Sequence, residues 1–257
     1  MKKFELTTNT KMFLGKKLFQ IKALINFGDV EAGELGGYIE KEENLSQAGD
    51  AWVTGDARVA GDAWVTDNAR VTGNARVAGD AWVTDNARVA GDAWVTDNAR
   101  VTDNARVTGD ARVAGDARVT GDAWVAGDAW VTDNARVTDN ARVTGDARVA
   151  GDARVTGDAW VAGDAWVTDN AWVAGDAWVA DNACYTTIKG FGREYRTTTF
   201  FRCKDGKVRV QCGCFYGDLE EFRAIVKETH GKSKKAIEYL IIADLMELHF
   251  EEKENDK

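Results

Sequence analysis

Side chains that could do catalytic or metal chemistry are scarce in this 257-residue chain. It has two histidines, His230 and His249, and its four cysteines all follow residue 183. A zinc site could be assembled from Cys203, Cys212, Cys214 and His230, but a paired C-x-x-C spacing is absent and buried, apolar cysteines explain the alternation better. We therefore predict no cofactor, no metal and no catalytic residue, with acyl transfer at a composite site near His230 as an alternative.

Arginine and tryptophan carry the chemistry of the middle of the chain, which contains no histidine, cysteine, lysine or glutamate. All ten tryptophans lie between Trp52 and Trp178, and each follows an alanine and precedes a valine, as do the interspersed arginines. A guanidinium group binds phosphates and carboxylates through paired hydrogen bonds, and an indole ring stacks on bases and on guanidinium groups. What these residues can bind depends on which of them become neighbours.

A six-residue repeat positions these side chains. Valine recurs at every sixth residue from Val53 to Val179, in 22 copies of Ala-(Arg/Trp)-Val-(Thr/Ala)-(Gly/Asp)-(Asp/Asn). The first four residues alternate as in a strand with one buried face, so Ala and Val should point inward and Arg or Trp outward. Every turn pair contains Gly or Asn, the residues that adopt a positive φ most readily, which predicts one left-handed Gly or Asn at each corner.

The repeat resembles the hexapeptide repeat of left-handed β-helix proteins, in which an aliphatic residue precedes a small one by four positions, as Val53 precedes Ala57. The resemblance covers residues 49–183 and implies three repeats per coil, hence about seven coils and a prism ~35 Å long at ~4.8 Å per coil. It also makes acyltransferase the default enzyme class, since many proteins with this repeat are acyltransferases. The predicted fold is mainly β: a parallel, left-handed β-helix with an N-terminal cap and a small α+β (ββαα) C-terminal domain.

With 18 residues per coil, the outward positions form three rows along the prism. One row brings four arginines into register between two tryptophans, and it is the predicted binding site: Trp82, Arg100, Arg118, Arg136, Arg154 and Trp172. Unless corner aspartates satisfy these arginines, they form a ladder that could hold phosphates, with the tryptophans as stacking platforms. The simpler interpretation is that the Arg and Trp side chains only cover a flat β face and bind no ligand. Threonine and alanine mix irregularly at the fourth position of the unit, so no regular threonine array is expected.

The two ends of the chain differ from the repeats. Residues 1–48 should cap the first coil, with a strand over Lys17–Leu24. The segment Phe27–Ile39, followed by Asn44–Gln47, resembles the entry into the coils of YdcK-like hexapeptide-repeat proteins, a group associated with bacteria and prophages. That resemblance brings no assigned activity.

Residues 184–250 are predicted to form a hairpin and two helices. A two-residue Asp205-Gly206 turn would pair Cys203 with Val208, placing these residues on one apolar face: Thr199, Phe201, Cys203, Val208, Val210, Cys212 and Cys214. Asp218 and Glu221 form a capping box for a helix that ends at Gly231, and Ser233 caps a second helix. The residues expected on the inward face of that second helix are Ile237, Leu240, Ile241, Leu245 and Leu248. Residues 251–257 are predicted to be disordered.

These features together favour a non-catalytic binding or scaffold protein, cytoplasmic and phage- or prophage-encoded. Its expected partner is a host protein or an anionic, nucleotide-like ligand. The net charge of −9 and the lack of a long apolar run argue against general nucleic-acid or membrane binding. The alternatives are a structural spacer, an acidic rod that imitates DNA, and a hexapeptide-repeat acyltransferase. The resemblance to the β-helix class implies a homo-oligomer, with a trimer as the commonest form.

Overall fold

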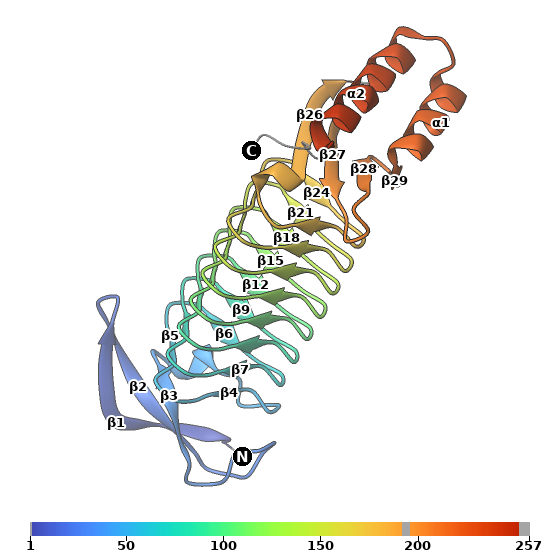
Figure 1. Ribbon diagram of the computed structural model, residues 1–257. Helices are drawn as coiled ribbons and strands as arrows, with labels where there is room; N and C mark the ends of the chain where they lie inside the picture. The colour runs from blue at the N-terminus through green and yellow to red at the C-terminus, as the bar shows by residue number, and fades with distance from the viewer. Residues whose placement is uncertain (1, 192–195, 252–257) are drawn as a thin grey trace.

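The computed structural model describes residues 2–191 and 196–251 and shows a mainly β protein built around a parallel β-helix. Figure 1 shows the prism of stacked coils with an antiparallel β cap at one end, and a small sheet and two helices at the other. The predicted fold class is thus confirmed. No helix among the described residues is long and apolar enough to cross a membrane.

The repeats form three parallel sheets, which we call faces 1, 2 and 3. Face 1 is built from β4 (Trp52–Val53), β7 (Arg70–Val71), β10 (Arg88–Val89), β13 (Arg106–Val107), β16 (Trp124–Val125), β19 (Arg142–Val143), β22 (Trp160–Val161) and β25 (Trp178–Val179). Face 2 is built from β5 (Arg58–Val59), β8 (Arg76–Val77), β11 (Trp94–Val95), β14 (Arg112–Val113), β17 (Trp130–Val131), β20 (Arg148–Val149) and β23 (Trp166–Val167). Face 3 is built from β6 (Trp64–Val65), β9 (Trp82–Val83), β12 (Arg100–Val101), β15 (Arg118–Val119), β18 (Arg136–Val137), β21 (Arg154–Val155) and β24 (Trp172–Val173).

Each strand pairs with the strands 18 residues before and after it, as the prediction of three repeats per coil requires. Arg100 pairs with Arg118, and the Arg100 amide donates to the Ala117 carbonyl at 2.9 Å. The inward alanines and valines from Ala51 to Val179 are at most 1% exposed and form one continuous core. The prism has about 8 turns, slightly more than the seven coils predicted from the repeats alone. The additional turn precedes the repeats and is irregular: β3 pairs with β5, and Leu45 pairs with Val65.

The corners correct one expectation. Where glycine is missing between two repeats, the residue with positive φ is the aspartate at the first turn position, as at Asp103 (φ 61°), and not the following asparagine; Asp181, after the last repeat, is instead extended (φ −154°). The Asp103 carboxylate accepts hydrogen bonds from the Thr102 hydroxyl (3.1 Å) and from the Gly121 amide in the next coil (3.2 Å). These bonds offset the cost of the left-handed backbone. The asparagines instead hydrogen-bond along the corner, for example Asn86 Nδ2 to Asn104 Oδ1 at 3.1 Å.

The N-terminal segment closes the open end of the first coil. The antiparallel strands β1 (Phe4–Phe13), β2 (Lys16–Ala23) and β3 (Leu35–Ile39) join face 2 through parallel pairing of β3 with β5, and a short 3-10 helix, η1 (Glu42–Asn44), follows. Lys3 is buried and donates to the carbonyls of Gly49 (3.2 Å) and Ala51 (2.9 Å), while burial lowers its pKa to about 8. The cap also covers Trp52, which is 1% exposed, so the expectation that every row residue points into solvent is wrong there.

The C-terminal sheet differs from the predicted hairpin. After η2 (Asn182–Cys184), four antiparallel strands follow: β26 (Tyr185–Phe191), β27 (Arg196–Arg202), β28 (Val208–Cys212) and β29 (Phe215–Asp218). Cys203 bonds to Lys207 across a three-residue loop, with Gly206 at φ 78°. Pairing is therefore shifted by one residue, and Phe200 rather than Phe201 lies opposite Val210.

This shift separates residues that were predicted to share a face. Phe200, Val210 and Cys212 pack toward the helices, whereas Phe201 and Cys203 join the core of the prism. Strand β27 is consequently covered on both sides, because it lies between the last coil and the helices.

The helices are α1 (Leu219–His230) and α2 (Lys234–Phe250). The Asp218–Glu221 capping box, the end of α1 at Gly231 and the Ser233 cap of α2 are confirmed. The predicted inward face of α2 is wrong. Ala236, Tyr239, Ile242, Ala243, Met246 and Phe250 are buried, whereas Ile237, Ile241, Leu245 and Leu248 are exposed. The disorder predicted for 251–257 concerns residues that, apart from Glu251, lie outside the described part of the chain.

Candidate functional site

Face 3 places the six predicted residues in one row. Parallel pairing joins Trp82 to Arg100, Arg100 to Arg118, Arg118 to Arg136, and so on through Arg154 to Trp172. Because paired strands keep the same register, the outward side chains stack directly above one another at about 4.8 Å per coil. The row therefore exists as the period of 18 predicts.

Four of the six predicted residues line one groove, which we call the face-3 groove. Its volume is about 380 Å³, and its lining residues are Asp80, Trp82, Asn98, Arg100, Asp116, Arg118, Asn134 and Arg136. The row side chains form one wall, and the corner residues two positions earlier form the other. Arg154 and Trp172 continue the row beyond this groove. The Arg154 guanidinium lies 5.6 Å from the Trp172 ring, and the Trp172 amide donates to the Thr199 hydroxyl of the C-terminal sheet at 2.9 Å.

The arginines of the face-3 groove are not neutralised by the aspartates beside them. None of Arg100, Arg118 and Arg136 forms an ion pair with an acidic side chain in the described residues. Arg100 lies over the Trp82 ring at 5.1 Å, whereas Arg118 and Arg136 lie over no aromatic ring in the part of the chain that the structure describes. Three guanidinium groups thus share the groove with two carboxylates, those of Asp80 and Asp116.

A second groove on face 1 has the same architecture and a different charge. It has a volume of about 400 Å³ and is lined by Asn104, Arg106, Asp122, Trp124, Asn140, Arg142 and Asp158. Here a tryptophan separates two arginines, and two aspartates balance them. The face-1 groove is therefore a natural comparison for the face-3 groove, since both have the same backbone and corner geometry.

Sequence reasoning did not place two sets of residues in a groove beside the ladder. The corner side chains, including Asp80 and Asp116, were considered as partners of the arginines and not as the lining of a groove. The fourth positions of face 3 are threonine in six consecutive coils, so the expectation of an irregular array is wrong for this face: Thr66, Thr84, Thr102, Thr120, Thr138 and Thr156. Sorting the fourth position by the period of 18 would have shown these threonines. Thr84, Thr102 and Thr138 donate their hydroxyl protons to the next residue, an aspartate.

The histidines and cysteines do not form a site with the ladder. His230 stacks on Tyr239 at 5.9 Å at the end of α1, and Cys203 lies on the opposite side of the sheet from Cys212. Burial, followed by the charge of Asp176, raises the pKa of Cys203 to about 12, so its thiol stays protonated and is a poor nucleophile near neutral pH. No cluster of three or more potential metal ligands occurs among the described residues.

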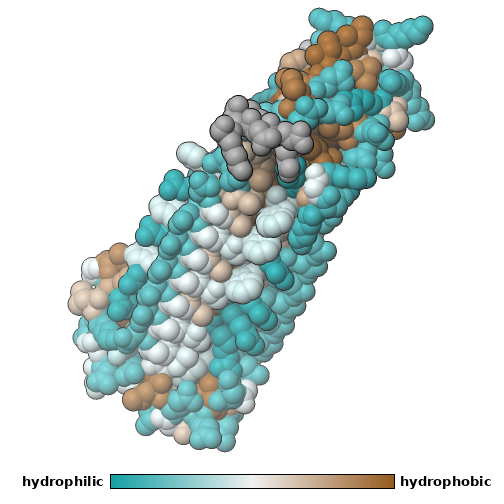
Figure 2. All heavy atoms as spheres, in the orientation of Figure 1, coloured by the Kyte–Doolittle hydropathy of each residue, from teal (hydrophilic) through white to brown (hydrophobic). Residues whose placement is uncertain are grey.

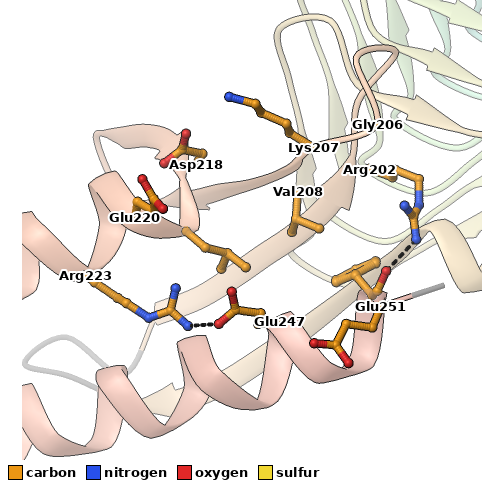
Figure 3. Close-up of a pocket in the computed structure, with 11 residues that line it drawn as sticks. Arg202, Gly206, Lys207, Val208, Asp218, Glu220, Arg223, Glu247 and Glu251 are labelled. Carbon is orange, nitrogen blue, oxygen red and sulfur yellow. Dashed lines mark hydrogen bonds and ion pairs between the residues drawn. The ribbon is translucent and has the colours of Figure 1, made fainter. Parts of the chain in front are cut away.

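A pocket of about 310 Å³ lies between α1, α2 and the sheet. Figure 3 shows Arg223 directed at Glu247, and Arg202 directed at the end of α2, where it donates to the Phe250 carbonyl at 2.7 Å. Arg223 also pairs with Asp244 at 2.9 Å. Neither histidine and none of the cysteines lines this pocket. Its arginines hold the helices together, which leaves the face-3 groove as the better candidate for ligand binding.

The chain is similar to solved structures, but not to known families or curated proteins. No family model matches the chain, and no curated protein matches it. The acetyltransferase domain of PglB from Neisseria gonorrhoeae, solved in complex with acetyl coenzyme A, is similar over 57% of this chain, with a TM-score of 0.35 and 13% identity. The chain spans about half of that structure, 55% of its length.

This finding corrects the function predicted from the sequence. The chain was expected to be a non-catalytic binding or scaffold protein, yet the matched structure is an acetyltransferase domain with acetyl coenzyme A bound. This finding contradicts the non-catalytic prediction and agrees better with the acyltransferase alternative. A likeness at this level concerns the fold alone.

Proposed function

We propose that this protein is an acyltransferase that binds the phosphates of an acyl-coenzyme A in the face-3 groove. The observation that carries the proposal is the stack of Arg100, Arg118 and Arg136, whose guanidinium groups have no acidic partner within the described chain. Like charges opposite one another on neighbouring strands are destabilising. An anion bound between them would remove that repulsion.

The adenine and the phosphates of coenzyme A match the tryptophan and the arginines in their order along the groove. Its diphosphate and 3′-phosphate are multiply charged, and arginine binds phosphate through two parallel hydrogen bonds. Trp82, which is 41% exposed, stands at one end of the arginines and contacts Arg100 (5.1 Å) and Trp64 (5.6 Å) through its ring, so an adenine would stack there by displacing the Arg100 guanidinium. The spacing of about 4.8 Å per coil allows successive phosphates to meet successive guanidinium groups.

The carboxylates of the groove would lie beside the phosphates and not beside the reacting carbonyl. Asp80 and Asp116 face the same space as the arginines, whereas the pantetheine arm of an acyl-coenzyme A carries the thioester away from the diphosphate. In the transfer, the acceptor nitrogen forms a bond to the thioester carbonyl carbon, and the carbon–sulfur bond breaks. The sulfur keeps the electron pair, and the proton lost by the nitrogen passes to the thiolate or to water. The contribution of the groove in this scheme is to position the coenzyme by its phosphates.

Calorimetry with acetyl coenzyme A, combined with detection of the free thiol released in the presence of amine acceptors, tests the proposal. We expect the double variant R118E/R136E to weaken binding at least about 100-fold, since hydrogen bonds between charged groups each contribute about 1.5–3 kcal/mol. The matched control is R106E/R142E, which makes the same change in the face-1 groove and should leave binding within about twofold.

Equal losses in the two variants, or no binding by the native protein, would overturn the placement in the face-3 groove. Binding without thiol release from any amine acceptor would overturn the transferase function. The YdcK-like affiliation suggested by the residues before the first coil, a phage or prophage origin and a cytoplasmic location are likewise proposals.

A further inference from the structure

Helix α2 is apolar on two sides, and only one of them is covered. Its buried side packs against α1 and the sheet through residues such as Tyr239, Ile242 and Met246. Its other side presents four large aliphatic residues, which we call the α2 stripe: Ile237 (54% exposed), Ile241 (62%), Leu245 (52%) and Leu248 (66%). A surface helix normally places charged and polar residues on the side away from its own core. The α2 stripe is therefore an uncovered contact surface.

The stripe is continuous and lies away from the prism. Its residues are spaced by four, four and three positions, so they fall on one side of the helix over about 16 Å. Figure 2 shows hydrophobic residues gathered over the two helices at the far end of the molecule, in contrast to the polar and neutral surface of the coils. Docking there would leave the face-3 groove open.

The charges of α2 run against its own helix dipole. Three lysines stand at its beginning, Lys232, Lys234 and Lys235, and its first turn contains no acidic residue. Glu247 and Glu251 stand at its end, where Glu247 pairs with Arg223 of α1 and His249 is the basic residue of the last turn. Cations near the start of a helix and anions near its end are both unfavourable for an isolated helix. An antiparallel neighbour of the same sequence would place each lysine end beside an acidic end.

We propose that two copies of this chain associate through the α2 stripe, with the two α2 helices antiparallel about a twofold axis. In this arrangement Ile241 opposes Leu245 of the partner subunit, and Ile237 opposes Leu248 of the partner subunit. Lys234, whose side chain is 90% exposed and lies 3.7 Å from Glu238 of its own helix, opposes Glu251 of the partner subunit. The stripe is self-complementary, as an isologous interface requires. The result is a four-helix contact between two prisms that point in different directions.

The mass in solution of the full-length chain tests this proposal, measured by light scattering after gel filtration from about 1 to 100 µM, a range that covers weak self-association. The native protein is expected at twice its 28.1 kDa chain mass. The variant I241E/L245E should raise the dissociation constant at least about tenfold, because it places charges in the centre of the interface. Both positions are more than half exposed, so the fold should tolerate the change, and an unchanged melting temperature would verify it.

A charge exchange tests the antiparallel orientation. K234E and E251K should each weaken the dimer, and the double variant K234E/E251K should restore it. A parallel pair would instead place Lys234 beside Lys234, and the double variant would rescue nothing. A monomer at every concentration, or an oligomer that I241E/L245E leaves intact, would overturn the proposal. A native protein that is a monomer alone and forms a dimer only with a different protein would also overturn the proposal.

Discussion

The outward rows of faces 2 and 3 each contain four arginines and three tryptophans in a different order, and the order decides what the arginines contact. On face 2, arginine and tryptophan alternate from Arg76 to Trp166. Each of these arginines lies over an indole ring: Arg76 at 4.6 Å from Trp94, Arg112 at 4.8 Å from Trp130, and Arg148 at 5.4 Å from Trp130. On face 3 the arginines are consecutive, so only the outer two have a ring beside them, and Arg118 and Arg136 face only other arginines along the row.

The comparison shows how one repeat can produce two kinds of surface: one in which the arginines contact tryptophans of the same face, and one in which they stay available for a ligand. Alternation lets the chain use its own cation–π contacts, which stabilise the fold by about 0.5–1 kcal/mol each at exposed sites. A consecutive run forgoes those contacts and keeps positive charge available for a ligand. Face 2 is therefore expected to contribute to stability, and face 3 to function.

The largest expected difference in stability comes from removing arginines from each face. R112A/R148A removes four cation–π contacts, at 6.0, 4.8, 5.4 and 5.7 Å, and should lower the free energy of unfolding by about 2 kcal/mol. R118A/R136A removes none of these contacts and should change stability by less than about 0.5 kcal/mol. Urea unfolding followed by tryptophan fluorescence measures both. An equal decrease in the free energy of unfolding for the two double variants would contradict the assignment of face 2 to stability and face 3 to function.

Converting face 3 to the order of face 2 should exchange function for stability. R118W places an indole between Arg100 and Arg136 and creates two cation–π contacts, which should raise the free energy of unfolding by about 1 kcal/mol. The same change removes one guanidinium and should weaken acetyl coenzyme A binding about tenfold. R112K on face 2 serves as the control, since it keeps a cation between two rings. A variant that gained stability and still bound as tightly would argue against a role for Arg118.

Salt should have the smallest effect, and it should act on the two faces differently. Raising the ionic strength from about 0.05 to 0.5 M shortens the screening length to a few ångströms and weakens the repulsion within the arginine run. Relative to R118A/R136A, the native protein should gain about 0.5 kcal/mol of stability. The difference between the native protein and R112A/R148A should stay nearly constant, because those cations contact their rings directly. Unfolding midpoints at the two salt concentrations provide the measurement.

Much of the prism follows from the sequence, because every coil repeats the same local choices. The inward Ala and Val, the 18-residue register and the three rows need only the period and the alternation within each unit. The site row needed no more than that. The groove needed the structure, because the distance between Arg118 and the corner residue Asp116 depends on how the corner turns. At that corner Gly115 has the positive φ (69°), as the rule predicts, whereas the corners one coil away have Asp97 (59°) and Asp133 (60°) there, which a rule based on Gly and Asn does not anticipate.

The ends of the chain were predicted less well, for a physical reason. The hairpin register depended on whether two or three residues form the loop at Asp205, and a shift of one residue moves every side chain to the other face of the strand. Helix α2 carries apolar residues on two sides, and its sequence alone does not say which side meets the sheet. Both the strand register and the buried side of α2 depend on packing against segments that are distant in the sequence.

The tryptophans separate what the sequence determines from what tertiary structure decides. Trp52 and Trp166 occupy the same position of the unit Ala-Trp-Val-Thr, and both have the same strand conformation. The local sequence determines that each side chain points away from the coil. Trp52 is nevertheless 1% exposed and Trp166 is 52% exposed, because the rings of Phe4 and Phe27 in the N-terminal cap close over Trp52 at 6.4 and 5.3 Å. Burial depends on what another part of the chain brings to that surface, and the repeat contains no information about it.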